Sequence, residues 1–382
     1  MLWTVARTGS DDEQTLPTER GPEAPTRVEG TPLGLEMVPG LLAPGTLVGG
    51  RFRIETFLAT GGMGEVYRAV HVHLNRPVAL KLVRGDMSND ETVAARFLRE
   101  AQLLSQLESP HVVRVFDFGQ SETGRLFLAM ELVDGRPLDV VLREEKRLDA
   151  SRAIALLVQV CRGLEEAHGC GVVHRDLKPA NIMVGKRRDG GEVARILDFG
   201  IARRAGSAES NLTTAGLIVG TPAYMPPEQA RGETLDARAD LYALGCVAWK
   251  LLTGRTPFVS DVMVRLVSMH LNEATPAPES VNPALHDWPA LCAVLIRALQ
   301  KKPDDRYQSA REFADALEAA EQRAPAMVDT AFPDWPSADQ VEKVEEVVWP
   351  PPEEPAPSPP ADPAVDAFFG LVPGQLLDEP KK

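Results

Sequence analysis

Cysteine is scarce in this sequence and occurs in no C-x-x-C pair. The 382 residues include 4 cysteines, which are Cys161, Cys170, Cys246 and Cys292. Zinc ribbons and thioredoxin-like redox sites need paired cysteines, so this spacing argues against both classes. A disulfide framework is also unexpected in a chain of this size, and few cysteines are typical of a reducing compartment. We therefore expect a cytoplasmic protein.

The sequence also lacks long hydrophobic runs and an excess of positive charge. Its most apolar stretch, residues 241–252, is 12 residues long and includes Lys250, whereas a transmembrane helix needs about 18 or more apolar residues. Residues 1–13 have no basic segment followed by an apolar one, which argues against a secretory signal. The formal net charge is −14, which is unfavourable for wrapping nucleic acid. We expect no membrane span and no nucleic-acid partner.

Acidic residues and proline are concentrated at the two ends. Residues 1–45 hold 7 acidic and 3 basic side chains, residues 323–382 hold 12 and 4, and the two segments contain 19 of the 32 prolines. The region between them is nearly balanced, with 36 acidic and 34 basic side chains. Segments like the two ends bury too little apolar surface to offset chain entropy. The composition predicts a disordered segment over 1–45, a folded domain over 46–322 and a disordered tail over 323–382.

Within the folded region, strand-like segments precede helical ones. Short stretches rich in Val, Ile, Phe and Tyr predict strands over 51–58, 64–71, 77–83, 112–119 and 126–133. Apolar residues spaced by 3 and 4 predict a helix over 91–107, and further helices are expected over 151–168, 239–252, 287–299 and 309–322. This order predicts an α+β fold, with a small sheet lobe over 46–133 and a larger helical lobe over 134–322.

A glycine-rich segment lies between the first two predicted strands. Glycines such as Gly61, Gly62 and Gly64 let the backbone approach a polyphosphate and aim N–H groups at its oxygens. A Rossmann site needs a helix after the glycines, whereas the residues that follow here favour a strand. A Walker A loop is absent, because Arg187 follows Gly185-Lys186. By itself the segment is equally compatible with a hairpin that binds no ligand.

Three further motifs follow it along the chain. They are Val78-Ala79-Leu80-Lys81, His174-Arg175-Asp176-Leu177-Lys178-Pro179-Ala180-Asn181 and Asp198-Phe199-Gly200. In this order they resemble the protein kinase signature set. The glycine-rich segment and residues 220–225 resemble those of bacterial eukaryotic-like serine/threonine protein kinases. The resemblance covers residues 46–322 and implies a bilobal fold with a small antiparallel β-sheet, one key helix and a larger helical lobe.

The resemblance also implies a reaction, in which the γ-phosphate of ATP moves to Ser or Thr hydroxyls of protein substrates with Mg²⁺ or Mn²⁺ bound. Such transfer depends mainly on positioning and charge neutralisation. Lys81 would hold the α- and β-phosphates, oriented by Glu100. Asp198 and Asn181 would bind the metal, and Asp176 would accept or orient the proton of the substrate hydroxyl.

Other positions match the family's nucleotide site and its substrate preference. A lysine two residues after the catalytic aspartate marks serine/threonine kinases, and Lys178 stands there. The nucleotide would be surrounded by Ala59, Gly61, Gly62, Gly64, Val66, Ala79, Met130, Glu131, Val133 and Met183. Ala59 replaces the first glycine of the family's phosphate loop, and we expect ATP binding to survive because alanine tolerates the extended backbone of a strand end.

The resemblance implies regulatory and supporting residues as well. Arg175 could clamp a phosphorylated activation loop, and we expect autophosphorylation at Thr213 or Thr214, since a phosphate adds about −1.5 to −2 charges. Asp240 should anchor the catalytic loop from below. Two supporting contacts are also expected, an ion pair of Glu228 with Arg306 and a stack of His174 on Phe199.

Several alternatives stay open at this point. A pseudokinase scaffold would bind partners without transferring phosphate, and a small-molecule phosphotransferase would share the fold but act on another substrate. Residues 341–349 and 368–372 of the tail are less polar than their surroundings and are compatible with docking partners or with a solvated linker. Homodimerisation through the small lobe occurs in relatives, and nothing in this sequence demonstrates it.

Overall fold

A six-stranded antiparallel sheet forms the first part of the fold. The computed structural model describes residues 41–61, 64–84, 90–187, 189–200 and 222–323. The strands are β1 (Leu47–Val48), β2 (Phe52–Gly61), β3 (Gly64–His71), β4 (Arg76–Val83), β5 (Val115–Gln120) and β6 (Leu126–Glu131). They lie in the order β1-β2-β3-β4-β6-β5, and every neighbouring pair is antiparallel. The register pairs Ala59 with Val66 and Val66 with Lys81, so these three residues form a row across the sheet.

One helix, α2 (Glu91–Leu104), packs on this sheet. The side chain of Asp90 caps its N-terminus by accepting hydrogen bonds from the backbone N–H groups of Thr92 and Val93, which satisfies donors that have no partner inside a helix. The buried residues of α2 recur at spacings of 3 and 4, which places them on one face. They are Val93, Phe97, Ala101 and Leu104. This face joins the main hydrophobic core, as the sequence pattern predicts.

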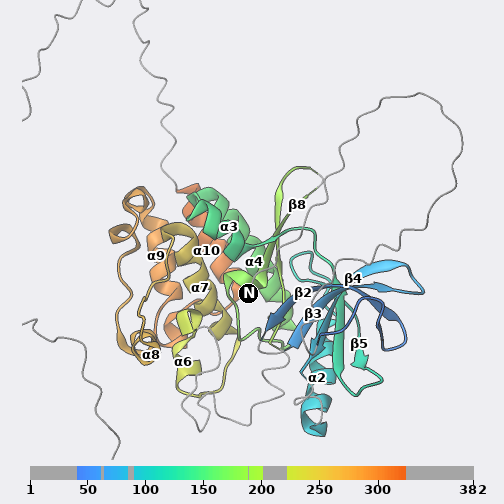
Figure 1. Ribbon diagram of the computed structural model, residues 1–382. Helices are drawn as coiled ribbons and strands as arrows, with labels where there is room; N and C mark the ends of the chain where they lie inside the picture. The colour runs from blue at the N-terminus through green and yellow to red at the C-terminus, as the bar shows by residue number, and fades with distance from the viewer. Residues whose placement is uncertain (1–40, 62–63, 85–89, 188, 201–221, 324–382) are drawn as a thin grey trace, which may run out of the picture. The chain divides into compact units, whose positions relative to one another are not determined.

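The second part of the fold is mainly helical (Figure 1). Its α-helices are α3 (Leu138–Glu145), α4 (Ala150–Gly169), α6 (Pro227–Ala230), α7 (Ala237–Thr253), α8 (Met263–Asn272), α9 (Pro289–Ala298) and α10 (Ala310–Gln322). Short 3₁₀ turns are η1 (Pro179–Asn181), η2 (Pro222–Tyr224), η3 (Pro278–Ser280), η4 (Pro283–Asp287) and η5 (Pro303–Asp305). A small antiparallel sheet joins β7 (Arg136–Pro137), β8 (Ile182–Lys186) and β9 (Glu192–Ile196). Helix α7 is buried on nearly all sides, including Trp249, which is typical of a central core helix.

This architecture confirms the predicted α+β class, with a sheet lobe that precedes a helical lobe. The five predicted strands correspond to β2 to β6, and the predicted helices correspond to α2, α4, α7, α9 and α10. The sequence pattern did not predict β1, α3, α6, α8 or the small sheet. The domain limits of 46–322 stay a prediction, as does disorder in the two ends, because residues 1–40 and 324–382 lie outside the described part of the chain.

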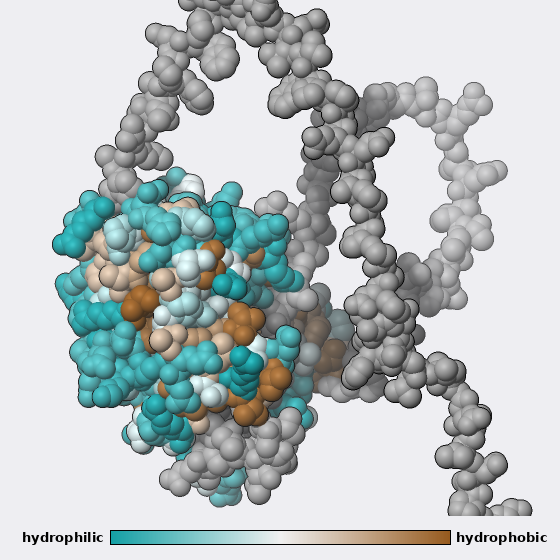
Figure 2. Space-filling view, turned by 90° about the vertical axis from the view of Figure 1, so that its left-hand side faces the viewer, coloured by the Kyte–Doolittle hydropathy of each residue, from teal (hydrophilic) through white to brown (hydrophobic). Residues whose placement is uncertain are grey.

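The surface of the helical lobe is mostly hydrophilic, but apolar patches interrupt it on the face shown in Figure 2. Exposed apolar side chains gather at the start of α8, where Val259, Val262, Met263 and Val264 are all exposed. Among the described helices, none combines the length and the hydropathy that crossing a bilayer requires.

A buried ion pair joins α6 to the segment that precedes α10, as predicted. Glu228 is 3% exposed and Arg306 is fully buried. Both guanidinium Nη atoms of Arg306 donate to the Glu228 carboxylate at 2.7 Å. Arg306 also donates to the backbone oxygens of Arg238, Gln300 and Lys301. The buried charges are therefore paired and hydrogen-bonded, as burial requires.

Replacing Arg306 by methionine should destabilise the protein by about 3–5 kcal/mol, because the Glu228 carboxylate would remain buried without its partner. Urea unfolding of the two proteins measures this difference. Arg311→Met is the matched control, since Arg311 is exposed and its ion pair with Glu165 spans 3.8 Å, and it should change the stability by less than about 1 kcal/mol. Equal effects of the two substitutions would contradict the assignment.

Candidate active site

A buried carboxylate on α7 holds the loop that connects α4 to β8. Asp240 is 1% exposed. Its Oδ1 accepts a hydrogen bond from the backbone N–H of Arg175 at 2.8 Å. Its Oδ2 contacts the backbone N–H of His174 at 2.7 Å and Nε2 of His168 at 2.8 Å. Burial alone would raise the pKa of Asp240, but the hydrogen bond and charge of His168 outweigh it and the pKa is lowered. Asp240 thus anchors the loop, as the sequence predicted.

Two residues of the site have backbone conformations that non-glycine residues rarely adopt. The φ angle of Arg175 is +64° and that of Asp198 is +50°. Such conformations cost of order 1–3 kcal/mol and persist where the surroundings enforce them. At Arg175 the enforcing contact is the hydrogen bond from its N–H to Asp240.

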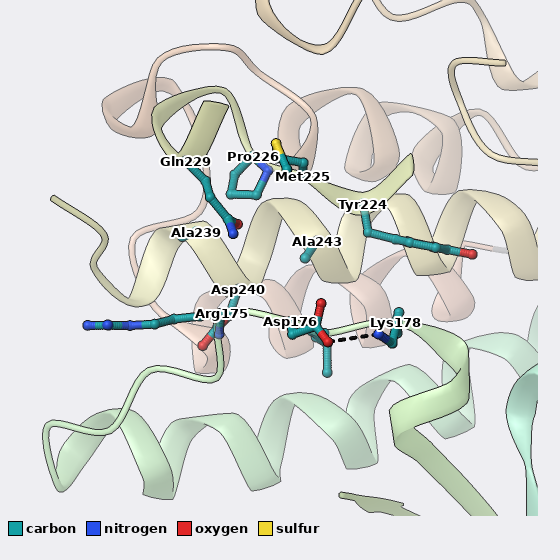
Figure 3. Close-up of a pocket in the computed structure, with 11 residues that line it drawn as sticks. Arg175, Asp176, Lys178, Tyr224, Met225, Pro226, Gln229, Ala239, Asp240 and Ala243 are labelled. Carbon is teal, nitrogen blue, oxygen red and sulfur yellow. Dashed lines mark hydrogen bonds and ion pairs between the residues drawn. The ribbon is translucent and has the colours of Figure 1, made fainter. Parts of the chain in front are cut away.

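The loop presents a carboxylate and an ammonium group to one another (Figure 3). Nζ of Lys178 donates to Oδ2 of Asp176 at 2.7 Å. Nδ2 of Asn181 donates to the backbone oxygen of Asp176 at 2.8 Å, which fixes the end of the loop. The structure therefore brings three of the predicted catalytic residues together within eight positions of His174.

Hydrogen bonds connect this loop to the segment that carries Asp198. The backbone N–H of Leu197 donates to the backbone oxygen of Asn181 at 2.8 Å. Nε2 of His174 donates to the backbone oxygen of Leu197 at 2.8 Å, and the N–H of Gly200 donates to the backbone oxygen of His174 at 3.0 Å. The rings of His174 and Phe199 pack with centroids 4.9 Å apart, which confirms the predicted stack.

Asp198 meets the sheet lobe through Lys81. Nζ of Lys81 lies 2.9 Å from Oδ1 of Asp198, and both side chains are largely buried. Lys81 is on β4, so this ion pair joins the two lobes. Glu100 lies on α2. Its orienting pair with Lys81 stays a prediction.

A cavity of about 180 Å³ opens beside this ion pair. Six of its lining residues were expected around the nucleotide, namely Ala79, Met130, Glu131, Val133, Met183 and Asp198. Five further lining residues were not identified from the sequence, namely Leu58, Arg68, Leu132, Asp134 and Leu197. Two other described cavities hold about 20 Å³ each, which is room for little more than a water molecule. The large cavity is therefore the candidate ligand site.

The glycine-rich segment lies at the end of the β2–β3 hairpin. Gly64 has a φ of +144°, and a Cβ atom there would lie 1.8 Å from the backbone oxygen of Leu82. No other residue type fits this position without a shift of β4. Ala59 is buried and extended on β2, paired with Val66, as its strand-end role requires. Gly62 lies outside the described residues.

A smaller pocket borders Asp176 and Lys178 on the side of α6 and α7. Tyr224, Met225 and Gln229 line it opposite the loop. Figure 3 shows the Arg175 side chain extending away from the Asp176–Lys178 pair. Burial raises the pKa of Tyr224 above its ordinary value, so its hydroxyl stays protonated at neutral pH. The predicted phosphorylation sites Thr213 and Thr214 lie outside the described residues.

Comparison with known families shows to which family the chain belongs. A model of the protein kinase domain matches residues 52–317, which is most of the chain. The chain belongs to the protein kinase family. The bilobal kinase fold implied by the motifs is thereby confirmed.

Several relatives of this kinase are bacterial proteins. It is 44% identical over 279 residues to the serine/threonine-protein kinase pkn3 of Myxococcus xanthus, covering 72% of this chain and 51% of that protein. It is 41% identical to PknB of Mycolicibacterium smegmatis, and the match covers 72% of this chain and 44% of that protein. The crystal structure of the Mycobacterium tuberculosis PknI kinase domain matches with a TM-score of 0.58 and 30% identity, covering 73% of this chain and all of that one. The chain thus spans about half or less of these curated relatives.

Gly64→Ala should destabilise the kinase by about 1–3 kcal/mol and weaken ATP binding, because β3 and β4 must separate next to Lys81. Thermal unfolding and calorimetric titration with ATP measure the two effects. Gly169→Ala is the control, since no atom lies within 4 Å of the added methyl group. Normal ATP affinity in a folded Gly64→Ala protein would show that the hairpin does not shape the nucleotide site.

Proposed function

We propose that this kinase transfers the γ-phosphate of ATP to serine or threonine hydroxyls of protein substrates. The main support is the arrangement of two ion pairs. Lys178 pairs with Asp176 on one loop, and Lys81 pairs with Asp198 on the next. The hydrogen bond from Leu197 to Asn181 joins the two loops. The relatives named as serine/threonine-protein kinases support the same substrate class.

The cavity suits an adenine ring because its walls are largely apolar and lie beside a cation. Ala79, Met130 and Met183 supply apolar surface, and the backbones of Glu131 and Val133 supply polar groups at its edge. Lys81 would hold the phosphates by its ammonium group. Because the Lys81 side chain is largely buried, its attraction for an anion is stronger than it would be in water.

The donor set fits the divalent ion that the family uses. Asp198 offers a carboxylate, and Asn181 offers its side-chain oxygen because its Nδ2 is already committed to Asp176. Magnesium prefers oxygen ligands and takes several of them from substrate phosphates and water. When bound, Mg²⁺ or Mn²⁺ would neutralise phosphate charge.

Asp176 would orient the attacking hydroxyl and accept its proton, and Lys178 would contact the transferred phosphate. The 2.7 Å ion pair places these two roles on one loop. Asp240 fixes the backbone at His174 and Arg175, directly before Asp176. Positioning of this kind is the main source of rate in phosphoryl transfer.

Asp176→Asn should lower phosphorylation of a generic basic protein by about 10²- to 10⁴-fold, because the amide cannot accept the proton. ATP binding should persist, since Asp176 does not line the large cavity. Transfer from labelled ATP, with calorimetry for binding, measures both. The exposed Asp261→Asn is the control and should behave as the wild type.

Three outcomes would contradict the proposal. Undiminished transfer by Asp176→Asn would overturn the role of that residue. A wild-type protein that binds Mg-ATP but phosphorylates nothing would be a pseudokinase scaffold. Phosphorylation of small metabolites in place of proteins would indicate a small-molecule phosphotransferase.

Activation by autophosphorylation at Thr213 or Thr214 is part of the proposal. A phosphate there would carry about −1.5 to −2 charges, and the guanidinium of Arg175 would bind it. A cytoplasmic location, tail-mediated docking partners and a homodimer stay predictions.

A Thr213→Ala/Thr214→Ala protein should lose its activation-loop phosphate and most of its activity, because Arg175 would have no phosphate to bind. Mass spectrometry after incubation with ATP locates the phosphate, and the transfer assay gives the activity. A Ser207→Ala/Ser210→Ala protein serves as the control for loop substitution. Unchanged autophosphorylation and activity in the threonine variant would rule out this mode of activation.

A further inference from the structure

A half-buried lysine beside the active site has no role in the reaction proposed above. Lys250 lies on α7, the helix that also carries Asp240. Its Nζ donates to the hydroxyl of Tyr224 at 3.3 Å. Tyr224 in turn lines the pocket shared with Asp176 and Lys178. Lys250 is therefore separated by one side chain from the place where the phosphoacceptor must lie.

The charge of Lys250 is poorly compensated within the described residues. No carboxylate of that part of the chain forms an ion pair with its Nζ, whose recorded side-chain contact is the neutral hydroxyl of Tyr224. Burial lowers the pKa of Lys250, and the charge of Asp139 on α3 opposes that shift. Oδ2 of Asp139 lies 4.0 Å from the guanidinium of Arg143, and its Oδ1 is buried without a hydrogen bond to any described residue, so Asp139 balances Lys250 only through its charge at a distance. A partly desolvated ammonium group in this state gains stability from any anion that reaches it.

Other charges around the pocket do not replace this one. The ammonium group of Lys178 is already paired with Asp176. Figure 3 shows the Arg175 side chain on the opposite side of the pocket from the phenol end of Tyr224. An anion arriving beside the hydroxyl of Tyr224 would therefore meet Lys250, whose charge is offset only in part by Asp139 within the described part of the chain.

We propose that Lys250, with the hydroxyl of Tyr224, forms a subsite for an aspartate or glutamate side chain that flanks the phosphoacceptor of the protein substrate. The subsite rests on the proposed kinase function and specifies its substrate class. Binding forms a hydrogen bond to a charged donor and restores charge balance at the half-buried ammonium group.

A positional peptide library tests the subsite. Each peptide has one fixed Ser or Thr, and the flanking positions carry Ala, Asp, Glu, Lys or Arg in turn. With the full-length wild-type kinase, one flanking position should favour Asp and Glu over Ala by about tenfold or more in kcat/KM. Lys250→Met should remove that preference, and Lys250→Glu should reverse it toward Lys and Arg at the same position.

Two controls separate specificity from folding. Lys302→Glu makes the same charge change at an exposed lysine of the same lobe and should leave the profile unchanged. Asp139→Asn tests the alternative that Lys250 serves to balance Asp139. In that case Lys250→Met and Asp139→Asn would lower the thermal unfolding temperature alike, and neither would alter the profile.

The outcomes are distinguishable. A wild-type profile without an acidic preference, or one that survives in active Lys250→Met and Lys250→Glu proteins, overturns the subsite alone. Phosphorylation of no peptide or protein by the wild type contradicts the kinase function and the subsite with it. Reversal by Lys250→Glu, with a normal profile for Lys302→Glu, establishes the subsite.

Discussion

The active site of this kinase depends on one buried charge, the carboxylate of Asp240. A carboxylate without water must be satisfied by hydrogen bonds or it destabilises the fold by several kcal/mol. Here the donors are the backbone N–H groups of His174 and Arg175 and the ring of His168. They converge on Asp240 with Arg175 held at a φ of +64°. The fold can bury this charge in its central helix because the catalytic loop adopts that conformation.

The constraint extends from the helical core to the sheet. His174, fixed by Asp240, donates to the backbone of Leu197, and Asn181 accepts from the same residue. The next residue is Asp198, which reaches Lys81 on the sheet. Groups from distant parts of the chain are thus connected by a series of hydrogen bonds and one ion pair. Such networks become more rigid when every member is satisfied, which suits a reaction that relies on positioning.

Short sequence motifs predicted the residues of the candidate site, because the phosphate chemistry proposed for it restricts residue types locally. The strand pattern and turn glycines likewise predicted the sheet, including the β2–β3 hairpin. Contacts formed by tertiary packing left no such signal. The two-residue strand β7 exists through its pairing with β8, Arg68 lines the cavity because of the sheet register, and Lys250 meets Tyr224 across 26 positions. Periodicity within one segment carries no information about these partners.

The Asp240→Asn protein tests whether Asp240 positions the catalytic loop. The amide keeps the shape of the side chain but replaces one acceptor by a donor that faces other donors. Urea unfolding first identifies conditions in which the variant is folded, and ATP affinity and kcat are measured there. We expect an ATP affinity within about threefold of the wild type. We also expect a kcat lowered about 100-fold, because the catalytic loop would be slightly misplaced. A folded Asp240→Asn protein with wild-type kcat would contradict this role of Asp240.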